Sequence, residues 1–482
     1  MLAYYECGIL FARSYIINSV TSMIANTSNE RICRLVAKQR EYFNSHATLD
    51  IEFRLDALRK LRDAIKRYES DLMDALYSDL RKSNEEAFLT EFSIVYGEIA
   101  TFLKNLRGWA APSKKSSPIT LFPSRSEVLT EPLGCALIIA PWNYPVQLLL
   151  NPLVGAIASG CTAILKPSPY TPHVAELLER LIAETFDESY IAVVQGNRDV
   201  NAALLAEHYD IIFFTGSPSL GRVVMRAASE NLTPVVLELG GKSPVVIDSS
   251  ADVELAARRI AWGKTLNAGQ TCIAPDYLLI HREIKESFIE AFKREVRRLH
   301  GDDVSQSPHY VRMINDKAFN RVSSYIDSAK VRYGGRVDAT TRYIEPTLLD
   351  SPAIDSPVMQ EEIFGPVLPM IDISSIDEAI AFINSREKPL ALYVFGSKRV
   401  GERVFHHTSS GGGCINDVIM HVANGHIPFG GVGNSGMGRY HGRDSLYAFS
   451  HRRSVVVSPT WPDMPFRYAP YRWFKWVKRL LK

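Results

Sequence analysis

Apolar side chains recur every three or four positions in the segment 50–76, at Ile51, Leu55, Leu58, Leu61, Ile65, Tyr68, Leu72 and Leu76. This spacing places the apolar side chains on one face of an α-helix. The segment therefore predicts a long amphipathic helix, with Asp50 as its N-cap. Residues 84–108 predict further helix.

The hydrophobic pattern changes at residue 134, where short apolar runs begin to alternate with stretches that predict helix. The runs that predict strands are 135–140, 162–166, 191–195, 211–214 and 234–238. Alternating strands and helices are typical of a parallel, doubly wound sheet with helices on both faces. A second α/β region is predicted over residues 244–435. Outside both regions, segments 126–131 and 453–457 predict strands with exposed edges, which oligomers often cover.

One apolar run is long enough to be considered as a membrane-spanning segment. No charged residue lies between Glu131 and Lys166, a gap of 34 residues that is long enough to span a bilayer. The interruptions are Pro141, Asn143, Pro145, Asn151 and Pro152. Two buried strands that flank a buried helix explain the run better.

The first 28 residues are apolar, but they include Glu6 and Arg13. They lack the basic start and the small-residue cleavage site of a secretory signal. We expect an N-terminal extension, with a leader and a docking helix as open alternatives. Met23 is a second candidate start, so the sequence leaves open whether the first 22 residues belong to the mature protein.

The C-terminal residues 471–482 carry five cations and no acid. On a helix, one face would hold Trp473, Trp476, Val477 and Leu480, and another would hold Arg472, Lys475, Arg479 and Lys482. This pattern is typical of a helix that lies in a membrane interface. A terminal helix packed on the body, or over a substrate entrance, is the alternative.

Composition narrows the class of protein. The 482 residues are 46% hydrophobic and 22% charged, which is typical of a globular protein and excludes a disordered chain. The net charge of +2 gives no indication of nucleic-acid binding. Six cysteines form no CxxC pair, which fits a reducing compartment without disulfides. The adjacent His406 and His407 cannot share a helix face, and we expect no metal site.

Polar motifs follow the predicted strands of the first sheet, where open parallel sheets bind their ligands. Asn143 in PWNYP offers an amide, Lys166 ends a strand, and Gly216 and Gly221 bracket the start of a helix in FTGSPSLGR. A helix N-terminus in this position favours a phosphate group. Each motif alone also fits an ordinary turn, strand end or helix start.

Two further side chains have the chemistry of a base and a nucleophile. Glu238 ends an apolar strand in LELGGKSP, and burial there would raise its pKa toward that of a general base. A solvated or ion-paired acid is the alternative. Cys272 lies in the small-residue stretch NAGQTCIAPD, where a thiolate would be a nucleophile for a carbonyl carbon. The ordinary role of a single cysteine is that of a small buried hydrophobe.

Together and in this order, the motifs resemble the aldehyde dehydrogenase superfamily. The resemblance rests on PWNYP, KPS, FTGS, ELGGKSP, GQTC, EEIFGP (361–366) and PFGGVGNSGMGRYHG (428–442), and it covers about residues 31–460. The ending, with FSHRRS at 449–454, is most similar to the class 3 branch, which includes fatty and aromatic aldehyde dehydrogenases.

This resemblance implies an α/β fold of the aldehyde dehydrogenase type, with two doubly wound domains and a small β extension. The implied divisions are an N-terminal extension (1–30), a dinucleotide-binding domain (31–110 and 134–237), a catalytic domain (238–435), oligomerisation segments (111–133 and 436–460) and a basic aromatic tail (461–482). We expect a cytoplasmic homodimer whose residues 471–482 are available to the inner face of a membrane.

The resemblance also implies NAD(P)-dependent oxidation of a medium- or long-chain aliphatic or aromatic aldehyde to its acid. Cys272 would form a thiohemiacetal and then a thioester, while Asn143 and the backbone N–H of Cys272 stabilise the oxyanion. Glu238 would activate water to release the acid. The implied cofactor-binding residues are Lys166, Gly216, Ser217, Gly221, Glu362, Phe364 and Trp142.

One position departs from the family pattern. Many relatives carry a glutamate three residues after the lysine, where it binds the ribose hydroxyls and repels the phosphate of NADP. This chain has Pro169 there, so both NAD and NADP stay open. A CoA-acylating relative and a silent scaffold are the competing functions. Intact Glu238, Cys272 and Asn143 favour the hydrolysing dehydrogenase.

Overall fold

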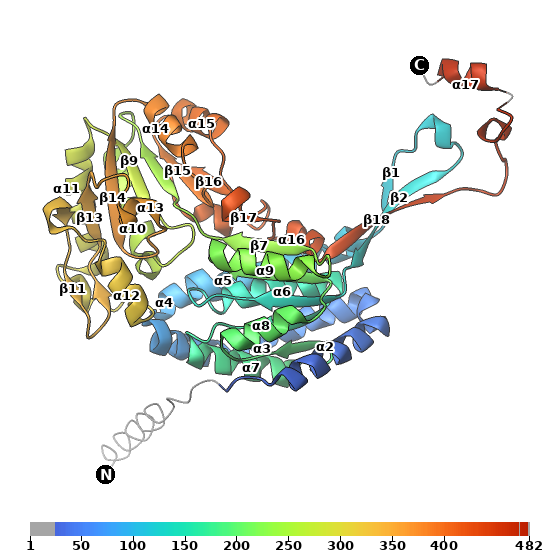
Figure 1. Ribbon diagram of the computed structural model, residues 1–482, viewed down its shortest axis with the longest axis horizontal. Coiled ribbons are helices and arrows are strands. Elements are labelled where there is room, and N and C mark those ends of the chain that lie inside the picture. Colours follow the sequence, from blue (N-terminus) through green and yellow to red (C-terminus); the bar gives the residue numbers. More distant parts are fainter. Residues whose placement is uncertain (1–24, 472, 481–482) are drawn as a thin grey trace, which may run out of the picture.

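The computed structural model describes residues 25–471 and 473–480 (Figure 1). The strands of these residues form two large sheets, a three-stranded sheet and a two-stranded ribbon. Helices cover both faces of each large sheet, so the predicted α/β architecture is confirmed. The expectations for residues 1–24 lie outside the described residues.

The first large sheet has the strand order β17-β7-β6-β3-β4-β5, and its pairs are parallel except β17 with β7. Its strands are β3 (Cys135–Ile139), β4 (Thr162–Lys166), β5 (Ile191–Val193), β6 (Ile211–Gly216), β7 (Val235–Leu239) and β17 (Gly436–Met437). The five strands predicted between residues 135 and 238 are present, and their ends differ from the predicted ones by at most two residues.

Two helix layers enclose this sheet. One face carries α3 (Ile51–Leu80), α5 (Ser93–Ala110), α6 (Gln147–Ser159), α7 (Pro172–Thr185) and α16 (Arg443–Ala448), and the other carries α2 (Asn29–Asn44), α8 (Arg198–Ala206) and α9 (Pro218–Ser229). Successive residues of a strand point to opposite faces. Leu137 and Ile139 accordingly pack with Leu35 of α2, whereas Ala136 and Ile138 join the core on the opposite face.

The helix predicted over residues 50–76 is longer than the spacing of its apolar residues indicates. Helix α3 continues to Leu80 and ends at Arg81, which has a left-handed backbone conformation. The side chain of Asp50 accepts a hydrogen bond from the Glu52 N–H at 3.1 Å, as expected of the N-cap. The next predicted helix, over residues 84–108, is helical throughout but changes its type. Its parts α4 (Asn84–Ala87) and α5 are joined by a π-helical turn, Phe88–Phe92.

The long uncharged run is confirmed as two buried strands around a buried helix. It forms β3, α6 and β4, and every residue of α6 is buried. Pro152 is accommodated inside this helix. None of the helices in the described part of the chain is long and apolar enough to cross a membrane.

The second large sheet has the order β10-β13-β14-β9-β8-β15-β16, and only β10 is antiparallel to its neighbour. Its strands are β8 (Pro244–Ile247), β9 (Tyr277–His281), β10 (Val331–Tyr333), β13 (Thr347–Asp350), β14 (Val367–Ile373), β15 (Ala391–Phe395) and β16 (Gly412–Ile415). The accompanying elements are α10 (Val253–Thr265), α11 (Lys285–His300), α12 (Asp316–Ser323), α13 (Pro357–Gln360), α14 (Ile376–Asn384), α15 (Lys398–His407), β11 (Val337–Asp338) and β12 (Tyr343–Ile344).

A third sheet forms an arm that extends away from the body (Figure 1). It consists of β1 (Ser113–Lys115), β2 (Arg125–Pro132) and β18 (Ser450–Val457), all antiparallel. The two segments predicted as strands outside the main sheets therefore pair with each other. Helix α17 (Phe474–Leu480) follows at the end of the arm.

Asp50→Ala should remove the acceptor for the Glu52 N–H and destabilise the first turn of α3 by about 1 kcal/mol. We expect faster amide hydrogen exchange at the start of α3. Asp56→Ala is the matched control, because the exposed Asp56 pairs with Lys60 within the same helix and caps nothing. Equal exchange in both variants would contradict the capping role.

Candidate active site

A cavity of about 1430 Å³ lies between the two large sheets, where strands of both sheets end. The first sheet contributes the loop after β3, the start of α9 and the end of β7. The second region contributes Cys272 and the segment 360–364. The predicted residues that line it are Trp142, Asn143, Gly216, Ser217, Glu238, Cys272, Glu362 and Phe364.

A second cavity, of about 460 Å³, reaches the same cysteine from another direction. Its apolar wall includes Leu89, Ile94, Leu148, Trp262, Leu266, Ile273, Leu299, Ile419, Val422 and Phe429. Cys272 and Leu148 line both cavities. The thiol of Cys272 therefore stands where a polar cleft and an apolar channel meet.

Cys272 follows a segment of unusual backbone conformation. Asn267, Ala268 and Gly269 all have positive φ angles, which turn the chain sharply after α10. Burial, together with the nearby carboxylates of Glu362 and Glu238, raises the pKa of the Cys272 thiol to about 12. The thiol is consequently protonated in the free protein at neutral pH.

Glu238 lies near the end of β7 and is only 3% exposed. Neither of its carboxylate oxygens has a hydrogen-bond partner among the described residues. Burial raises the pKa of Glu238 well above its usual value. A buried carboxyl group without partners is costly, and its charged form is a stronger base than an exposed carboxylate.

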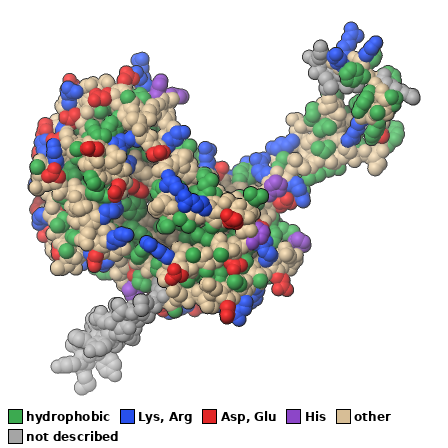
Figure 2. Space-filling model, viewed as in Figure 1, with side chains coloured by type: hydrophobic (Ala, Val, Ile, Leu, Met, Phe, Trp, Pro, Cys, Tyr) green, Lys and Arg blue, Asp and Glu red, His purple; other side chains and the backbone are tan. Residues whose placement is uncertain are grey.

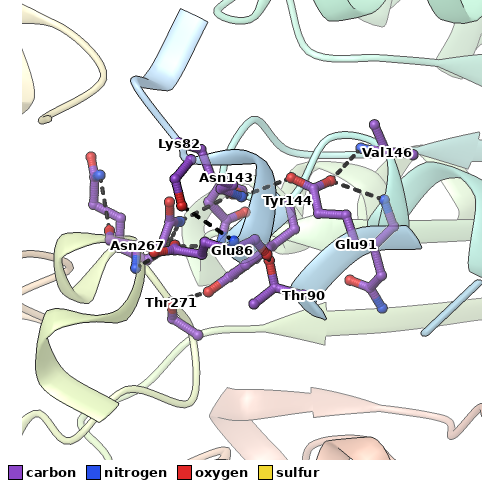
Figure 3. Close-up of polar contacts among 12 residues, drawn as sticks. Lys82, Glu86, Thr90, Glu91, Asn143, Tyr144, Val146, Asn267 and Thr271 are labelled. Atoms are coloured by element: carbon purple, nitrogen blue, oxygen red, sulfur yellow. Dashed lines mark hydrogen bonds and ion pairs between the residues drawn. The ribbon is translucent and has the colours of Figure 1, made fainter. Parts of the chain in front are cut away.

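Asn143 lies in the loop between β3 and α6 and is buried. Its side-chain amide donates to the Gln270 carbonyl at 3.0 Å, two residues before Cys272. Its own backbone carbonyl accepts hydrogen bonds from Lys82 and Asn267 (Figure 3). The neighbouring Tyr144 hydroxyl lies 2.6 Å from the Thr271 hydroxyl. The loop of Asn143 is thus linked directly to the loop of Cys272.

The segment 360–364 presents a second enclosed carboxyl group to the cleft. Glu362 has one oxygen without a partner among the described residues, and burial raises its pKa to about 8, with the nearby Asp276 carboxylate adding to the shift. A Cβ atom on Gly240 would overlap the Glu362 carboxylate, so a larger residue at this position would displace the Glu362 side chain. Phe364 has a positive φ of 49° and packs edge-to-face with Trp142 at 5.5 Å.

Two predicted cofactor residues do not line the cleft. The Lys166 ammonium is buried and donates to the Pro167 carbonyl at 2.8 Å, and burial lowers its pKa to about 8. Gly221 lies in the first turn of α9, where a Cβ atom would come within 2.7 Å of Leu239. Ser217, by contrast, is the N-cap of α9 at the edge of the cleft.

Several residues that support the site were not identified from the sequence. The Lys242 ammonium contacts the Asp276 carboxylate and donates to the Glu361 carbonyl at 2.7 Å. Arg321 donates to the backbone carbonyls of Glu362 and Ile363. Lys242 belongs to the ELGGKSP motif, which was the available signal, whereas Arg321 lies in no motif.

The cleft has the features that a dinucleotide requires. Gly216 and Ser217 lie at the N-terminus of α9, which favours a phosphate group. The unpartnered oxygen of Glu362 is an acceptor for a sugar hydroxyl, and the Trp142 and Phe364 rings offer flat apolar surface. These residues fit NAD or NADP, with the reacting end toward Cys272.

Comparisons with known proteins agree with this geometry. The sequence profile of the aldehyde dehydrogenase family matches residues 15–455. The chain is 48% identical to the 4,4'-diaponeurosporen-aldehyde dehydrogenase of Staphylococcus aureus, over 92% of this chain and 97% of that protein. It is 46% identical to the dimeric NADP-preferring aldehyde dehydrogenase of Rattus norvegicus, over 88% and 93% of the two chains.

A solved structure shows the same fold. The substrate-bound state of Staphylococcus aureus AldH superposes with a TM-score of 0.92 and 47% identity, covering 94% of this chain and 99% of that chain. The chain therefore belongs to the aldehyde dehydrogenase family, and it is an oxidoreductase that converts an aldehyde to the acid with NAD or NADP.

Proposed function

We propose that Cys272 is the nucleophile of this reaction, that Asn143 and the backbone N–H of Cys272 stabilise the oxyanion, and that Glu238 is the general base. The observation that carries the proposal is the position of Cys272, which lines both the polar cleft and the apolar channel. Asn143 and Glu238 line the same cleft, and the carboxylate of Glu238 is buried without a partner.

The proposed reaction has two stages on the sulfur atom of Cys272. The Cys272 thiol passes its proton to solvent water, the sulfur bonds to the aldehyde carbon, and the carbonyl oxygen becomes an oxyanion that accepts hydrogen bonds from the two donors. The nicotinamide ring would supply the hydride acceptor when the dinucleotide is bound. In the second stage a water molecule attacks the thioester carbon and its proton passes to Glu238. The carbon–sulfur bond then breaks, the carboxylic acid leaves, and Glu238 returns the proton to the Cys272 sulfur.

For the dinucleotide, we assign the pyrophosphate to Gly216 and Ser217 at the start of α9, with Gly221 permitting close packing of this helix. Glu362 would hold the nicotinamide ribose, and Phe364 and Trp142 its ring. Lys166 would hold the adenosine ribose, which requires its ammonium to turn away from the Pro167 carbonyl. Pro169 offers no carboxylate to repel a ribose phosphate, so both NAD and NADP should serve.

The substrate proposed is a medium- or long-chain aliphatic or aromatic aldehyde. The supporting observation is the channel behind Cys272, whose wall is mostly aliphatic and aromatic side chains. Burial of apolar surface provides the binding free energy for such substrates. The Staphylococcus aureus relative is named for 4,4'-diaponeurosporen-aldehyde, which is in keeping with this class.

We also propose a homodimer and a contact with a membrane surface. Segments 111–133 and 436–460 contain the arm, whose outer strand β18 has an edge that no described strand covers. One relative is named dimeric. Beyond the arm, Trp473, Phe474 and Trp476 are exposed beside basic residues (Figure 2). This composition suits the anionic cytoplasmic face of a membrane.

Glu238→Gln should block hydrolysis of the thioester without blocking its formation. We expect a burst of one NAD(P)H per active site. The steady-state rate that follows should be at least ~10²-fold below that of the wild type, because a general base contributes at least that factor. Stopped-flow absorbance at the nicotinamide band measures both phases. Unchanged steady-state turnover would remove Glu238 from the mechanism.

Alkylation of Cys272 by iodoacetamide should keep accelerating as the pH rises from 7 to 10. The thiolate is the reactive form, and a thiol pKa raised to about 12 means that its fraction grows throughout this range. Free cysteine, with a pKa of about 8.5, should level off near its own pKa. Mass spectrometry locates the label. A plateau below pH 8 would show that the thiolate already exists in the free protein.

Cys272→Ala is the control for the alkylation experiment and a test of the nucleophile. It should lose both the pH-dependent label and dehydrogenase turnover, while it retains binding of the dinucleotide measured by calorimetry. Cys33→Ala is the matched variant, since Cys33 is exposed and distant from both cavities. Normal turnover in Cys272→Ala would refute the assignment.

Deletion of residues 471–482 should abolish sedimentation of the protein with vesicles that contain phosphatidylserine. A second variant, Trp473→Ser/Trp476→Ser, keeps every cation and should lose only the part of binding that depends on aromatic insertion. Both variants should retain turnover of a short water-soluble aldehyde. Equal sedimentation of the full and shortened chains would favour a tail packed on another surface.

A further inference from the structure

An ion pair is completely enclosed beside the candidate active site. The Lys82 ammonium and the Glu91 carboxylate are 2.7 Å apart, and both side chains are 0% exposed. Removing two charges from water usually costs more than their attraction returns. Such a pair therefore contributes little to stability. Its role in the protein is indicated by its other contacts.

Both members of the pair hold the loop that carries Asn143 (Figure 3). Lys82 donates to the Asn143 backbone carbonyl at 3.2 Å, and its ammonium lies 4.2 Å from the centre of the Tyr144 ring. The second oxygen of Glu91 accepts hydrogen bonds from the backbone N–H groups of Val146, at 2.8 Å, and Gln147, at 3.2 Å. The loop is thus held in its middle by Lys82 and at its end by Glu91.

The local fold around Glu91 is exceptional. Glu91 lies in the π-helical turn Phe88–Phe92 between α4 and α5. Single π-helical turns inside helices are rare and occur frequently at functional sites. Lys82 precedes Glu91 by nine positions along the chain, and only Glu91 belongs to the π-helical turn.

A second donor reaches the same carbonyl from the loop of Cys272. The Asn267 side-chain amide donates to the Asn143 carbonyl at 3.0 Å and to the Gln270 carbonyl at 3.0 Å. The Gln270 carbonyl also accepts the Asn143 side-chain amide. Asn267 is held in turn by the Glu86 carboxylate, which accepts its backbone N–H at 2.9 Å. These contacts set the two loops at a fixed separation.

We propose that Lys82 and Glu91 are positioning residues, which hold Asn143 so that its amide is already aimed when the oxyanion forms on the Cys272 adduct. This inference rests on the proposed function of Asn143 and Cys272. Oxyanion donors are effective because they need no reorganisation during the reaction. A buried ion pair that contacts the middle and the end of the loop supplies that rigidity.

The test compares two reactions of Cys272 that need no dinucleotide. With p-nitrophenyl acetate, the sulfur bonds to the ester carbon, an oxyanion forms, and p-nitrophenolate leaves to give the acetyl thioester. With iodoacetamide, the sulfur displaces iodide and no oxyanion forms. The ratio of the acylation rate to the alkylation rate therefore reports oxyanion stabilisation, whereas thiol ionisation and access affect both rates.

In Lys82→Met/Glu91→Gln, the glutamine still accepts from Val146 and Gln147, and no buried charge is left unpaired. We expect the acylation rate to fall ~10- to 100-fold, as for a misplaced oxyanion donor. The alkylation rate should change less than about twofold, because the carboxylates that raise the pKa of Cys272 belong to Glu362 and Glu238. The hydride-transfer burst with an aldehyde should fall with the acylation rate.

Lys285→Met/Asp350→Asn is the matched control. Lys285, at the start of α11, and Asp350, at the end of β13, form another ion pair of low exposure, at 2.5 Å, and line neither cavity. Their other partners, Asp372 and Arg332, are partly exposed to solvent. Loss of this pair should change thermal stability and leave the ratio of the acylation rate to the alkylation rate at the wild-type value.

Asn267→Gly is the second variant, and it decides the question where the double variant does not fold. Glycine accepts the positive φ of this position, and the substitution removes the other donor to the Asn143 carbonyl. A lowered ratio in the folded double variant supports the inference, and a wild-type ratio there overturns it. Where only Asn267→Gly folds, its ratio decides in the same way. Equal release of p-nitrophenolate by wild type and Cys272→Ala would instead refute the proposed nucleophile.

Discussion

Negative charge is costly at the place where the two large sheets meet, and this cost governs the arrangement of the site. Burial raises the pKa of Glu238, Cys272 and Glu362, and the two carboxylates each make ionisation of the thiol harder. The enclosed groups therefore cannot all be charged together. An oxyanion formed there needs donors that are already in place, and neutral amides provide them without another buried charge. The same cost makes ionised Glu238 a strong base toward water.

The chain passes from the first large sheet to the second beside these groups, and it later returns to the first sheet as β17, which pairs with β7. Glu238 lies near the end of β7, and a short connection through Gly240 leads into β8 of the second sheet. That connection has no side chain at the point where Glu362 approaches. Residues with positive φ, among them Asn267, Ala268 and Phe364, occupy the other edges of the site. Backbone strain of this kind persists where the surrounding packing fixes it, and Asn267 and Ala268 are both buried.

Sequence patterns predicted the large elements well because their signals are local. Apolar runs marked β3 to β7 within two residues, and three-to-four periodicity marked α3. Cys272, Glu238 and Asn143 were predicted as site residues because each lies in a short motif that follows a strand or begins a loop, and the structure places all three around one cavity. Lys82 and Glu91 were not predicted, because periodicity reveals neither a π-helical turn nor which buried charges pair. For Lys166, the sequence predicted the position on β4 but did not predict the direction of the ammonium group.

The two cavities meet at the sulfur atom of Cys272, and in the proposed mechanism they have different tasks. The polar cleft holds the groups that manage protons and hydroxyls, whereas the apolar channel meets them only at Cys272 and Leu148. Because the hydrophobic effect is non-directional, the channel can accept aldehydes of different length without disturbing the donors around the reacting carbon. The rigid hydrogen-bonded loops of Asn143 and Asn267 lie between the two environments. In the proposed mechanism, selectivity for the aldehyde and the rate of the chemical step would depend on different residues, so that the first could change while the second stays fixed.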